Sequence, residues 1–202
     1  MPLISVEEVL PNVRLGLWRI EESVNTFFSL YPDLEVLKGE IDGYGSVQRR
    51  LEVLAVRALL YCMIASSVEL YHDKSGKPFL SNGVNIGISH THGCAAVIMS
   101  PSNRVSVDVE YINERVGRVA QRLLRTDENA DSLVEKLLHW CTKETLYKLY
   151  SEDSLSLSEM QLLSIDGNEH NGIITARNIR RNATVNVHYR LFDGFALTYV
   201  AL

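Results

Sequence analysis

The sequence predicts an α+β protein in which one chain forms two similar α/β lobes, residues 1–103 and residues 104–202. Three observations support this fold class. The chain has 202 residues and 46% hydrophobic content, enough for one sizeable core or for two small lobes that share one. Segments with helical periodicity and segments with strand periodicity occur in both halves. The two halves also share short stretches of similar sequence.

These similar stretches lie at matching places in the two halves. Each half has a long predicted helix that contains related residues near its end, Arg57–Tyr61 and Glu144–Lys148. Each half then closes on a glycine followed by a strand of small residues, Gly93–Ser100 and Gly194–Leu202. Two such short matches are as compatible with chance as with an internal duplication. If the halves are duplicates, they meet near Asn103.

The strongest predicted element of the first half is a helix over Ser46–Ser66, where apolar residues recur at helical spacing. A strand is predicted before it over Leu10–Ile20, followed by a helix and loop over Glu21–Leu37. Glycine and proline predict a turn after it, and two short strands complete this half. These later segments are Asp73–Pro78, Val84–Ser89 and Ala95–Ser100.

The second half begins with a predicted strand over Arg104–Tyr111. Two helices follow, over Asn113–Arg125 and Ser132–Tyr150. The remainder, from Leu162 onward, is predicted to form strands. They are Ile173–Ala176, Ala183–Tyr189 and Phe195–Leu202.

Charge and cysteine usage argue against several classes of protein. The net charge is −5, whereas nucleic-acid-binding proteins are usually basic, so we expect no nucleic-acid partner. Three widely spaced cysteines fit neither a disulfide framework nor a C-x-x-C zinc site: Cys62, Cys94 and Cys141.

No stretch reaches the roughly 18 apolar residues of a membrane span. Because Met1–Leu10 also lacks the features of a signal peptide, we expect a protein of the reducing cytoplasm that has no membrane contact.

The predicted strand over Arg104–Tyr111 carries two carboxylates on one face. Valines alternate with polar residues there, so Ser106, Asp108 and Glu110 point the same way. The like charges of Asp108 and Glu110 repel each other unless a positive charge lies between them. An oxygen-only pair suits Mg²⁺ better than zinc. The alternative is a solvated face of an edge strand.

The helix over Ser132–Tyr150 carries a stripe of three functional candidates. Trp140, Glu144 and Lys148 follow one another at intervals of four residues and therefore share one helix face. In one interpretation Glu144 and Lys148 form a surface ion pair of small energetic value. In the other, Glu144 is a third metal ligand or a general base, and Lys148 contacts phosphate oxygens.

Two further segments carry groups that bind anions. Ser89 and His90 end a predicted strand and are followed by the flexible Gly93, so they either present donors to a phosphate or form a polar turn. Lys77 lies in the turn Ser75–Pro78, where it either holds an anion or is simply exposed.

In this order and spacing, the segments resemble the 4′-phosphopantetheinyl transferase superfamily. The matching residues are Gly76–Pro78, Ile88–Thr91, Val107–Glu110 and Trp140–Lys148. The last two contain the patterns D-x-E and W-x-x-K-E-x-x-x-K, which together are highly specific. The length resembles the two-lobed, single-chain type that activates peptide synthetases. The resemblance implies a pseudo-twofold fold with the active site between the lobes, and we expect a monomer.

The sequence departs from the family pattern at three places. Ser106 stands where glycine is usual, two positions before the first aspartate. Thr145 stands where alanine or serine is usual, and Leu123–Leu124 lie where an aromatic pair is common. No charged position is affected, so the departures bear on packing and substrate preference more than on activity.

The resemblance implies a reaction and a set of roles. The family transfers the 4′-phosphopantetheine arm of coenzyme A to a serine of an apo acyl or peptidyl carrier protein and releases adenosine 3′,5′-bisphosphate. Asp108, Glu110 and Glu144 would hold Mg²⁺, or alternatively Mn²⁺, against the pyrophosphate. Glu144 would also be the general base, and Lys148 would stabilise the leaving phosphate.

Coenzyme A would be held by basic and hydroxyl-bearing side chains. Ser89 and His90 would contact its phosphates, and Lys77 would hold the nucleotide end. Arg49 and Arg50 are alternatives for a basic position at the 3′-phosphate. The full set of candidates is Arg50, Lys77, Ser89, His90, Lys143 and Lys148.

Four arginines between the acidic strand and the second long helix form a separate feature: Arg115, Arg118, Arg122 and Arg125. At about 100° per residue, their spacing places them on one helix face. This positive patch is either a docking face for an acidic carrier protein or a solvated helix face. Carrier proteins of fatty acid, polyketide or nonribosomal peptide synthesis are alternative partners.

Two other functions remain as alternatives. One is a catalytically inactive homologue that binds coenzyme A or a carrier protein. The presence of all three acidic residues and of Lys148 argues against a loss of catalytic activity. The other is a metal-dependent nuclease or phosphatase, which the negative net charge disfavours.

Overall fold

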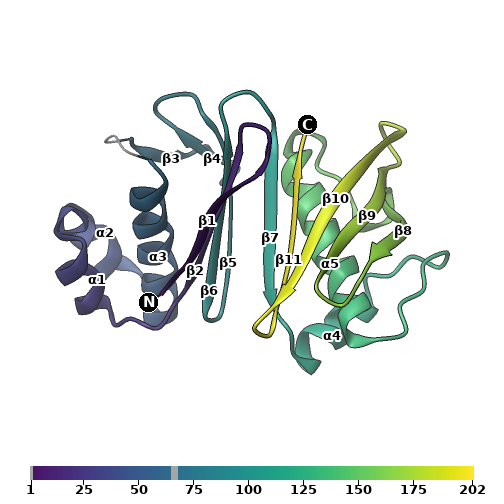
Figure 1. The fold of residues 1–202 in the computed structure, drawn as a ribbon, viewed down its shortest axis with the longest axis horizontal. Helices are drawn as coiled ribbons and strands as arrows, with labels where there is room; N and C mark the ends of the chain where they lie inside the picture. Colours follow the sequence, from purple (N-terminus) through teal and green to yellow (C-terminus); the bar gives the residue numbers. More distant parts are fainter. Residues whose placement is uncertain (1, 65–67) are drawn as a thin grey trace.

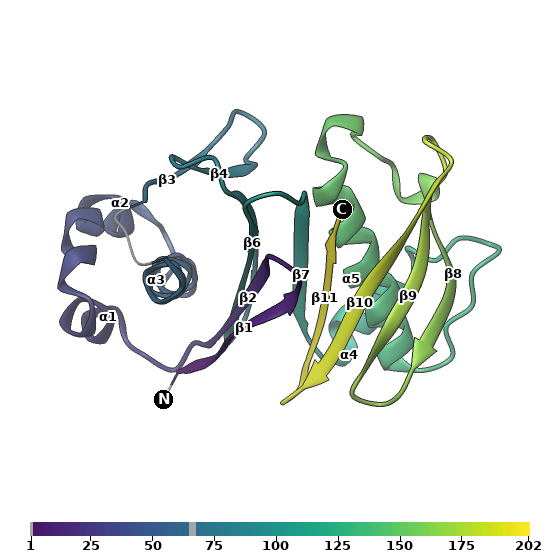
Figure 2. The ribbon, with the colours of Figure 1, turned by 45° about the horizontal axis from the view of Figure 1, so that its top comes forward.

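The computed structural model describes residues 2–64 and 68–202, which form four layers (Figure 1 and Figure 2). Two antiparallel sheets pack face to face in the middle, and helices cover the outer face of each sheet. The predicted mixed α+β class is confirmed. Among the described residues, no helix combines the length and the apolar character that a membrane crossing requires.

The first sheet has the strand order β1-β2-β6-β5. Its strands are β1 (Leu3–Leu10), β2 (Val13–Arg19), β5 (Asn85–Thr91) and β6 (Cys94–Ser100). Its outer face packs against a helical layer made of α1 (Val24–Leu30), η1 (Pro32–Leu37), α2 (Lys38–Gly43) and α3 (Val47–Met63). A small hairpin, β3 (Leu70–His72) and β4 (Pro78–Leu80), precedes β5.

The second sheet has the strand order β7-β11-β10-β9-β8. Its strands are β7 (Val105–Tyr111), β8 (Met160–Gly167), β9 (Asn171–Asn178), β10 (Ala183–Phe192) and β11 (Phe195–Ala201). The helices of this half are α4 (Glu114–Gln121), α5 (Leu133–Leu149), η2 (Ser151–Asp153) and η3 (Leu157–Glu159). Helix α5 starts at a capping box in which Ser132 and Glu135 each bond the other's backbone N–H.

The two halves repeat one arrangement of strands and helices. In the first, β2 leads through helices to the hairpin β5–β6, and β6 pairs with β2. In the second, β7 leads through α4, α5 and the additional strands β8 and β9 to the hairpin β10–β11, and β11 pairs with β7. Gly93 and Gly194 occupy equivalent hairpin turns with φ of 85° and 83°, conformations that glycine adopts without strain. The glycines shared by the two halves of the sequence therefore stand at equivalent points of the fold.

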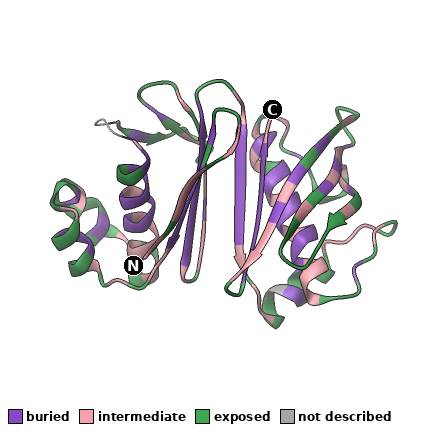
Figure 3. Ribbon diagram, viewed as in Figure 1, coloured by how far each residue is buried: buried purple, intermediate pink, exposed green. Residues whose placement is uncertain are grey.

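An apolar layer joins the sheets. Side chains of β2 and β6 meet those of β7 and β11 there, and residues such as Leu15, Ile98, Val107 and Leu197 have no exposed surface. Figure 3 shows these central strands as the most continuously buried part of the chain. At one edge of this layer β5 and β7 lie side by side and run in the same direction, although they belong to different sheets.

The β5–β7 contact is close at Gly87. A Cβ atom on this residue would lie 3.2 Å from Ser106 Cα and 3.4 Å from Val107 N on β7. It would also lie 3.0 Å from Ile98 Cγ2 on β6. Because two of these atoms belong to the backbone, the strands would have to separate to admit a side chain.

Several elements differ from the sequence-based prediction. The strand predicted over Leu10–Ile20 is the second arm of a hairpin, since the chain turns at Asn12, whose φ is 61°. The helix predicted over Ser46–Ser66 ends at Met63 in the described chain, and residues 65–66 lie outside the described residues. The helix predicted over Asn113–Arg125 ends at Gln121. The strands β1, β3 and β4 were not predicted, and β8 lies in the stretch from Leu162 onward for which strands were predicted without bounds for this one.

Substitution of Gly87 by alanine tests the close approach of the strands. We expect Gly87→Ala to lower the free energy of unfolding by about 1–3 kcal/mol, because backbone atoms of β7 block the added Cβ. Gly39→Ala on α2 is the control, since its added Cβ meets nothing within 4 Å. Urea unfolding followed by circular dichroism measures both. Equal stability of the two variants would contradict the close approach.

Candidate active site between the two sheets

The contact between β5 and β7, here called the β5–β7 seam, brings together side chains from both halves. Ser89 Oγ donates to Asp108 Oδ1 over 2.8 Å, and Thr91 Oγ1 donates to Glu110 Oε2 over 3.1 Å. Ser89 Oγ also accepts a hydrogen bond from Val109 N over 3.2 Å. The hydroxyl-rich strand of the first half and the acidic strand of the second thus form one polar junction.

Strand β7 places its side chains in two environments. Its valines pack into the apolar layer between the sheets, and its polar residues face α5. This alternation agrees with the sequence-based prediction. On the polar face, Ser106 Oγ donates to the Thr145 carbonyl over 2.8 Å, and Trp140 Nε1 donates to Glu110 Oε1 over 3.0 Å. Asp108 lies between Ser106 and Glu110 on this face and is buried.

Lys148, in the last turn of α5, completes the polar junction. Its Nζ donates to Asp108 Oδ1 over 2.6 Å, to Ser89 Oγ over 3.1 Å and to the Val107 carbonyl over 3.2 Å. Together with the contact of Trp140 to β7, these bonds show that the predicted stripe of α5 faces the acidic strand. The surface-ion-pair interpretation therefore does not describe Lys148, whose partner is Asp108 on another element.

The acidic groups of the junction destabilise one another's charged forms. Burial raises the pKa of Glu110, and the charge of Asp108 adds to this, while the hydrogen bond from Trp140 opposes it. Burial likewise raises the pKa of Glu144, and the charges of Asp108 and Glu110 act in the same direction. Lys148 is the cation that partly offsets this repulsion.

The chemistry of this site fits a hard divalent cation. Three carboxylates supply oxygen ligands, and Asp108 Oδ2 is buried without a hydrogen-bond partner in the described chain. Within residues 2–64 and 68–202, however, no three His, Cys, Asp or Glu side chains are close enough to hold one ion. The carboxylate oxygens are thus of the type that Mg²⁺ prefers, but in the described residues they do not form a three-ligand set, and the Lys148 ammonium neutralises Asp108.

His90 lies at the end of β5 against helix α3. Burial lowers its pKa; Glu52 opposes this effect, and Arg49 reinforces it. A neutral imidazole explains both of its contacts, because Nδ1–H can donate to Glu52 Oε2 over 3.1 Å while Nε2 accepts from Arg49 Nη1 over 2.5 Å. The imidazole and the guanidinium are therefore adjacent, and Arg49 is the α3 arginine at the site.

Arg50 lies elsewhere, although its position in the sequence made it an equal candidate. Its Nε donates to the Tyr44 carbonyl over 2.9 Å, and its Nη2 donates to the Asp42 carbonyl over 3.1 Å. These bonds fix the end of α2 to α3. Of the two arginines, Arg49 is therefore the one that contacts His90, since consecutive helix residues point about 100° apart.

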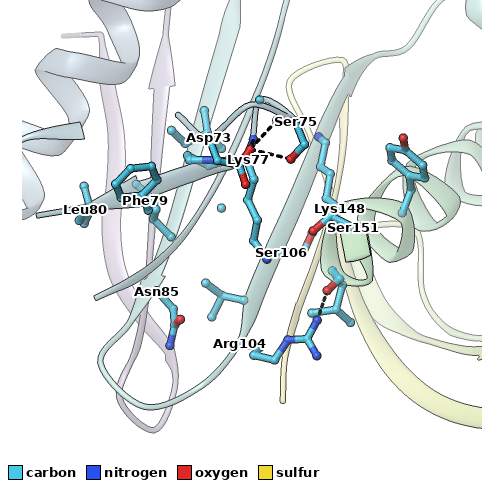
Figure 4. A pocket seen from close by; sticks show the side chains of 18 of the residues that line it. Asp73, Ser75, Lys77, Phe79, Leu80, Asn85, Arg104, Ser106, Lys148 and Ser151 are labelled. Atoms are coloured by element: carbon cyan, nitrogen blue, oxygen red, sulfur yellow. Dashed lines mark hydrogen bonds between the residues drawn. The ribbon is translucent and has the colours of Figure 1, made fainter. Parts of the chain in front are cut away.

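A cavity of about 460 Å³ opens beside the junction, between the two halves (Figure 4). Lys77 borders it from the β3–β4 turn, and Lys148 borders it from α5. Arg104 and the exposed Phe79 and Tyr147 also line it. The structure thus brings Lys77 and Lys148 to one cavity. Asp73 also lines this cavity, and Arg104 pairs with Glu152 Oε1 over 2.8 Å.

Lys143 does not contact this site. Its side chain is 1% exposed, and its Nζ donates to Glu128 Oε2 over 2.6 Å and to the Leu123 carbonyl over 2.8 Å. Burial raises the pKa of Glu128, but hydrogen bonds and positive neighbours outweigh this and hold it at about 2. His139 Nδ1 lies 3.7 Å from the same carboxylate, beyond hydrogen-bond distance. Lys143 anchors α5 to the preceding loop, and no part of it is available to a ligand.

The four arginines do not form the single stripe that was predicted. Helix α4 ends at Gln121, so Arg122 lies in the following turn. Arg125 lies beyond that turn, and its Nε pairs with Asp127 Oδ1 over 2.8 Å. The exposed remainder of the patch consists of Arg115, Arg118 and Arg122.

Sequence reasoning missed some residues of the site. Thr91 is two residues after Ser89 on one strand, and this period-two signal was available. Glu52 lies three residues after Arg49 on α3, which placed the two side chains on one face. No sequence signal pointed to Arg104, which reaches the cavity wall through the packing of β7 against α5.

Comparison of the chain with models of known protein families finds no match, and comparison with curated protein sequences finds none either.

Variants of the buried Glu128–Lys143 pair separate its structural role from catalysis. We expect Lys143→Met to lower the free energy of unfolding by about 3–5 kcal/mol, because it leaves a buried carboxylate unpaired. The double variant Glu128→Gln/Lys143→Met should recover part of this loss, since both charges are gone and the amide oxygen still accepts from a backbone N–H of Arg125 or Leu162. Urea unfolding at neutral pH measures all three proteins. A single variant as stable as the double would contradict the buried pair.

Proposed function

We propose that this protein transfers the 4′-phosphopantetheine arm of coenzyme A to a serine of an apo acyl or peptidyl carrier protein. The observation that carries the proposal is the polar junction at the β5–β7 seam. Ser89 from the first half, Asp108 from β7 and Lys148 from α5 meet there, although Ser89 and Lys148 are 59 residues apart. The repeated arrangement of the two halves supports a pseudo-twofold, two-lobed transferase fold with its site between the lobes.

Asp108, Glu110 and Glu144 would hold Mg²⁺, with Mn²⁺ as the alternative. When bound, the cation supplies charge neutralisation for the pyrophosphate of coenzyme A. Burial and neighbouring carboxylates raise the pKa values of Glu110 and Glu144, and one buried oxygen of Asp108 has no hydrogen-bond partner in the described residues. These features support the role, because a bound cation would offset the cost of burying negative charge here.

The transfer itself requires a base and an acceptor of developing charge. A bond forms between the carrier serine oxygen and the β-phosphorus of coenzyme A, and the bond from that phosphorus to the bridging oxygen breaks. The serine proton passes to Glu144, whose raised pKa makes it a better proton acceptor. Lys148 donates hydrogen bonds to the departing adenosine 3′,5′-bisphosphate, for which its ammonium is already placed between both halves.

The remaining cationic groups bind and orient the donor. His90 and Arg49 form a pair of hydrogen-bonding groups at one end of the seam that suits a phosphate. Lys77 and Arg104 border the cavity at the other end, where its volume of about 460 Å³ admits part of an extended nucleotide. Binding at both ends would hold the reacting phosphorus beside Glu144 and Lys148.

One observation favours a second candidate, a coenzyme A or carrier-protein binder without catalysis. The Lys148 ammonium already neutralises Asp108 over 2.6 Å, and no group of three acidic or imidazole ligands is formed in the described part of the chain. A protein in which this pairing persists would bind an anion through Lys77 and Arg49 without performing the transfer.

Mass spectrometry of an apo carrier protein tests the two candidates. We expect incubation with this protein, coenzyme A and Mg²⁺ to add one phosphopantetheine to the carrier. Glu144→Gln should slow the transfer by about 100-fold or more, because the base is lost. A chelator should abolish it. Glu169→Gln is the control, since the Glu169 side chain is 85% exposed on a distant turn.

The outcomes separate the candidates. Coenzyme A binding without transfer to carriers of fatty acid, polyketide and peptide synthesis would leave the inactive binder. If the protein neither binds coenzyme A nor performs the transfer, the assignment to this family is refuted.

Charge reversal on the exposed arginines tests carrier docking. We expect Arg118→Glu and Arg122→Glu each to slow association with an acidic carrier protein by about tenfold at low salt, since both side chains are exposed. Lys38→Glu on α2 is the matched charge reversal, and its side chain is 59% exposed. Stopped-flow binding at several salt concentrations measures the rates. Equal effects of all three changes would exclude a specific docking face.

A further inference from the structure

A buried chain of hydroxyl groups lies directly behind the polar junction. Ser106 Oγ on β7 donates to the Thr145 carbonyl on α5 over 2.8 Å. Thr145 Oγ1 shares a hydrogen bond of 2.6 Å with Thr198 Oγ1 on β11. The exposed fractions of the three residues are 1%, 0% and 0%, so water does not reach these bonds. We refer to these three residues as the hydroxyl tether.

The register of the sheet places the hydroxyl tether around Asp108. Thr198 is the cross-strand partner of Asp108, and Ser106 precedes Asp108 by two residues on the same face. On the helix side, Thr145 follows Glu144 directly and precedes Lys148 by three residues. Both neighbours of Asp108 on the sheet therefore bond the one turn of α5 that carries the functional pair.

The contacts of this turn determine how far α5 can slide over the sheet. Apolar packing is non-directional and tolerates small shifts, whereas hydrogen bonds of 2.6 and 2.8 Å fix both distance and orientation. Ser106 holds the helix to β7, and Thr198 holds it to β11. A helix bonded to two adjacent strands cannot rotate about either contact.

We propose that Ser106, Thr145 and Thr198 are positioning residues that set the height of Glu144 and Lys148 over Asp108. The inference rests on the proposed transferase function, in which these three groups act together. The tether touches no ligand itself. Its effect is on the distance between the carboxylates of β7 and of α5, hence on the affinity for a divalent cation and on the rate of transfer.

The chain offers a matched control for the test. Thr142 lies one helical turn before Thr145 on α5, is 0% exposed, and its Oγ1 has no hydrogen-bond partner in the described residues. Thr142→Val therefore makes the same chemical change in the same helix without removing a bond. Thr145→Val/Thr198→Val removes both hydroxyls of one bond, which limits the loss of stability because no buried polar group is left unpaired.

Two measurements are made on each variant. The first is the Kd for Mn²⁺ by titration calorimetry in the presence of coenzyme A, which needs no turnover. The second is kcat and KM for transfer to an apo carrier protein. We expect Thr145→Val/Thr198→Val and Ser106→Ala each to weaken Mn²⁺ binding and to lower kcat by about tenfold, with little change in the KM for coenzyme A.

Two comparisons complete the test. Thr142→Val should match the wild type in both measurements, and Thr145→Ser, which retains the hydroxyl, should restore them. Wild-type values in the double variant, or equal losses in Thr142→Val, would overturn the inference. If the wild type binds Mn²⁺ but shows no transfer activity, the transferase function is refuted. The positioning role is retained in that case if the tether variants bind Mn²⁺ more weakly than the wild type. A wild type that neither binds Mn²⁺ nor transfers would refute both.

Discussion

The hydrogen-bonded junction of Ser89, Asp108 and Lys148 is the interaction on which the rest of this structure depends. It lies where two edge strands from different sheets meet without a shared backbone ladder. Side chains therefore supply the polar contacts that a ladder would otherwise make. Gly87 permits the close approach, and the apolar layer behind it gives the sheets a fixed partner surface. The acidic strand, the hydroxyl strand and α5 are close because this junction holds all three.

Two lysines on the same helix have different roles because of what surrounds them. Lys143 is enclosed and balances one carboxylate, Glu128, whose pKa its surroundings hold at about 2. Lys148 is about one-third exposed and faces several acidic groups, so its charge is shared among more partners than it can satisfy. A fully balanced pair has no charge left for a ligand, whereas an unbalanced cluster retains capacity to bind one.

Periodic patterns predicted much of this arrangement, and single positions within them were less predictable. The alternation of β7 identified the faces of Asp108 and Glu110, and the four-residue spacing identified the stripe of α5, because both follow from backbone geometry. The choice between Arg49 and Arg50 depended on where α2 ends. The role of Lys143 depended on a loop residue, Glu128, that no pattern connects to it. The predicted arginine stripe was wrong because α4 ends at Gln121, and the backbone N–H of Arg125, four residues further on, donates to the same Glu128.

The parallel course of β5 and β7 without a backbone ladder has a consequence for ligand affinity. A polyanion that binds the Lys148 ammonium must compete with its contact to Asp108 and with its contact to Ser89, and the contact to Ser89 joins the two halves of the chain. Part of the intrinsic binding free energy is then spent on loosening the molecule, and the measured affinity is lower by that amount. The same few atoms therefore contribute both to ligand binding and to the contact between the two halves. A tighter seam makes a more rigid protein and a weaker binder, so the strength of this seam reflects a compromise between the two.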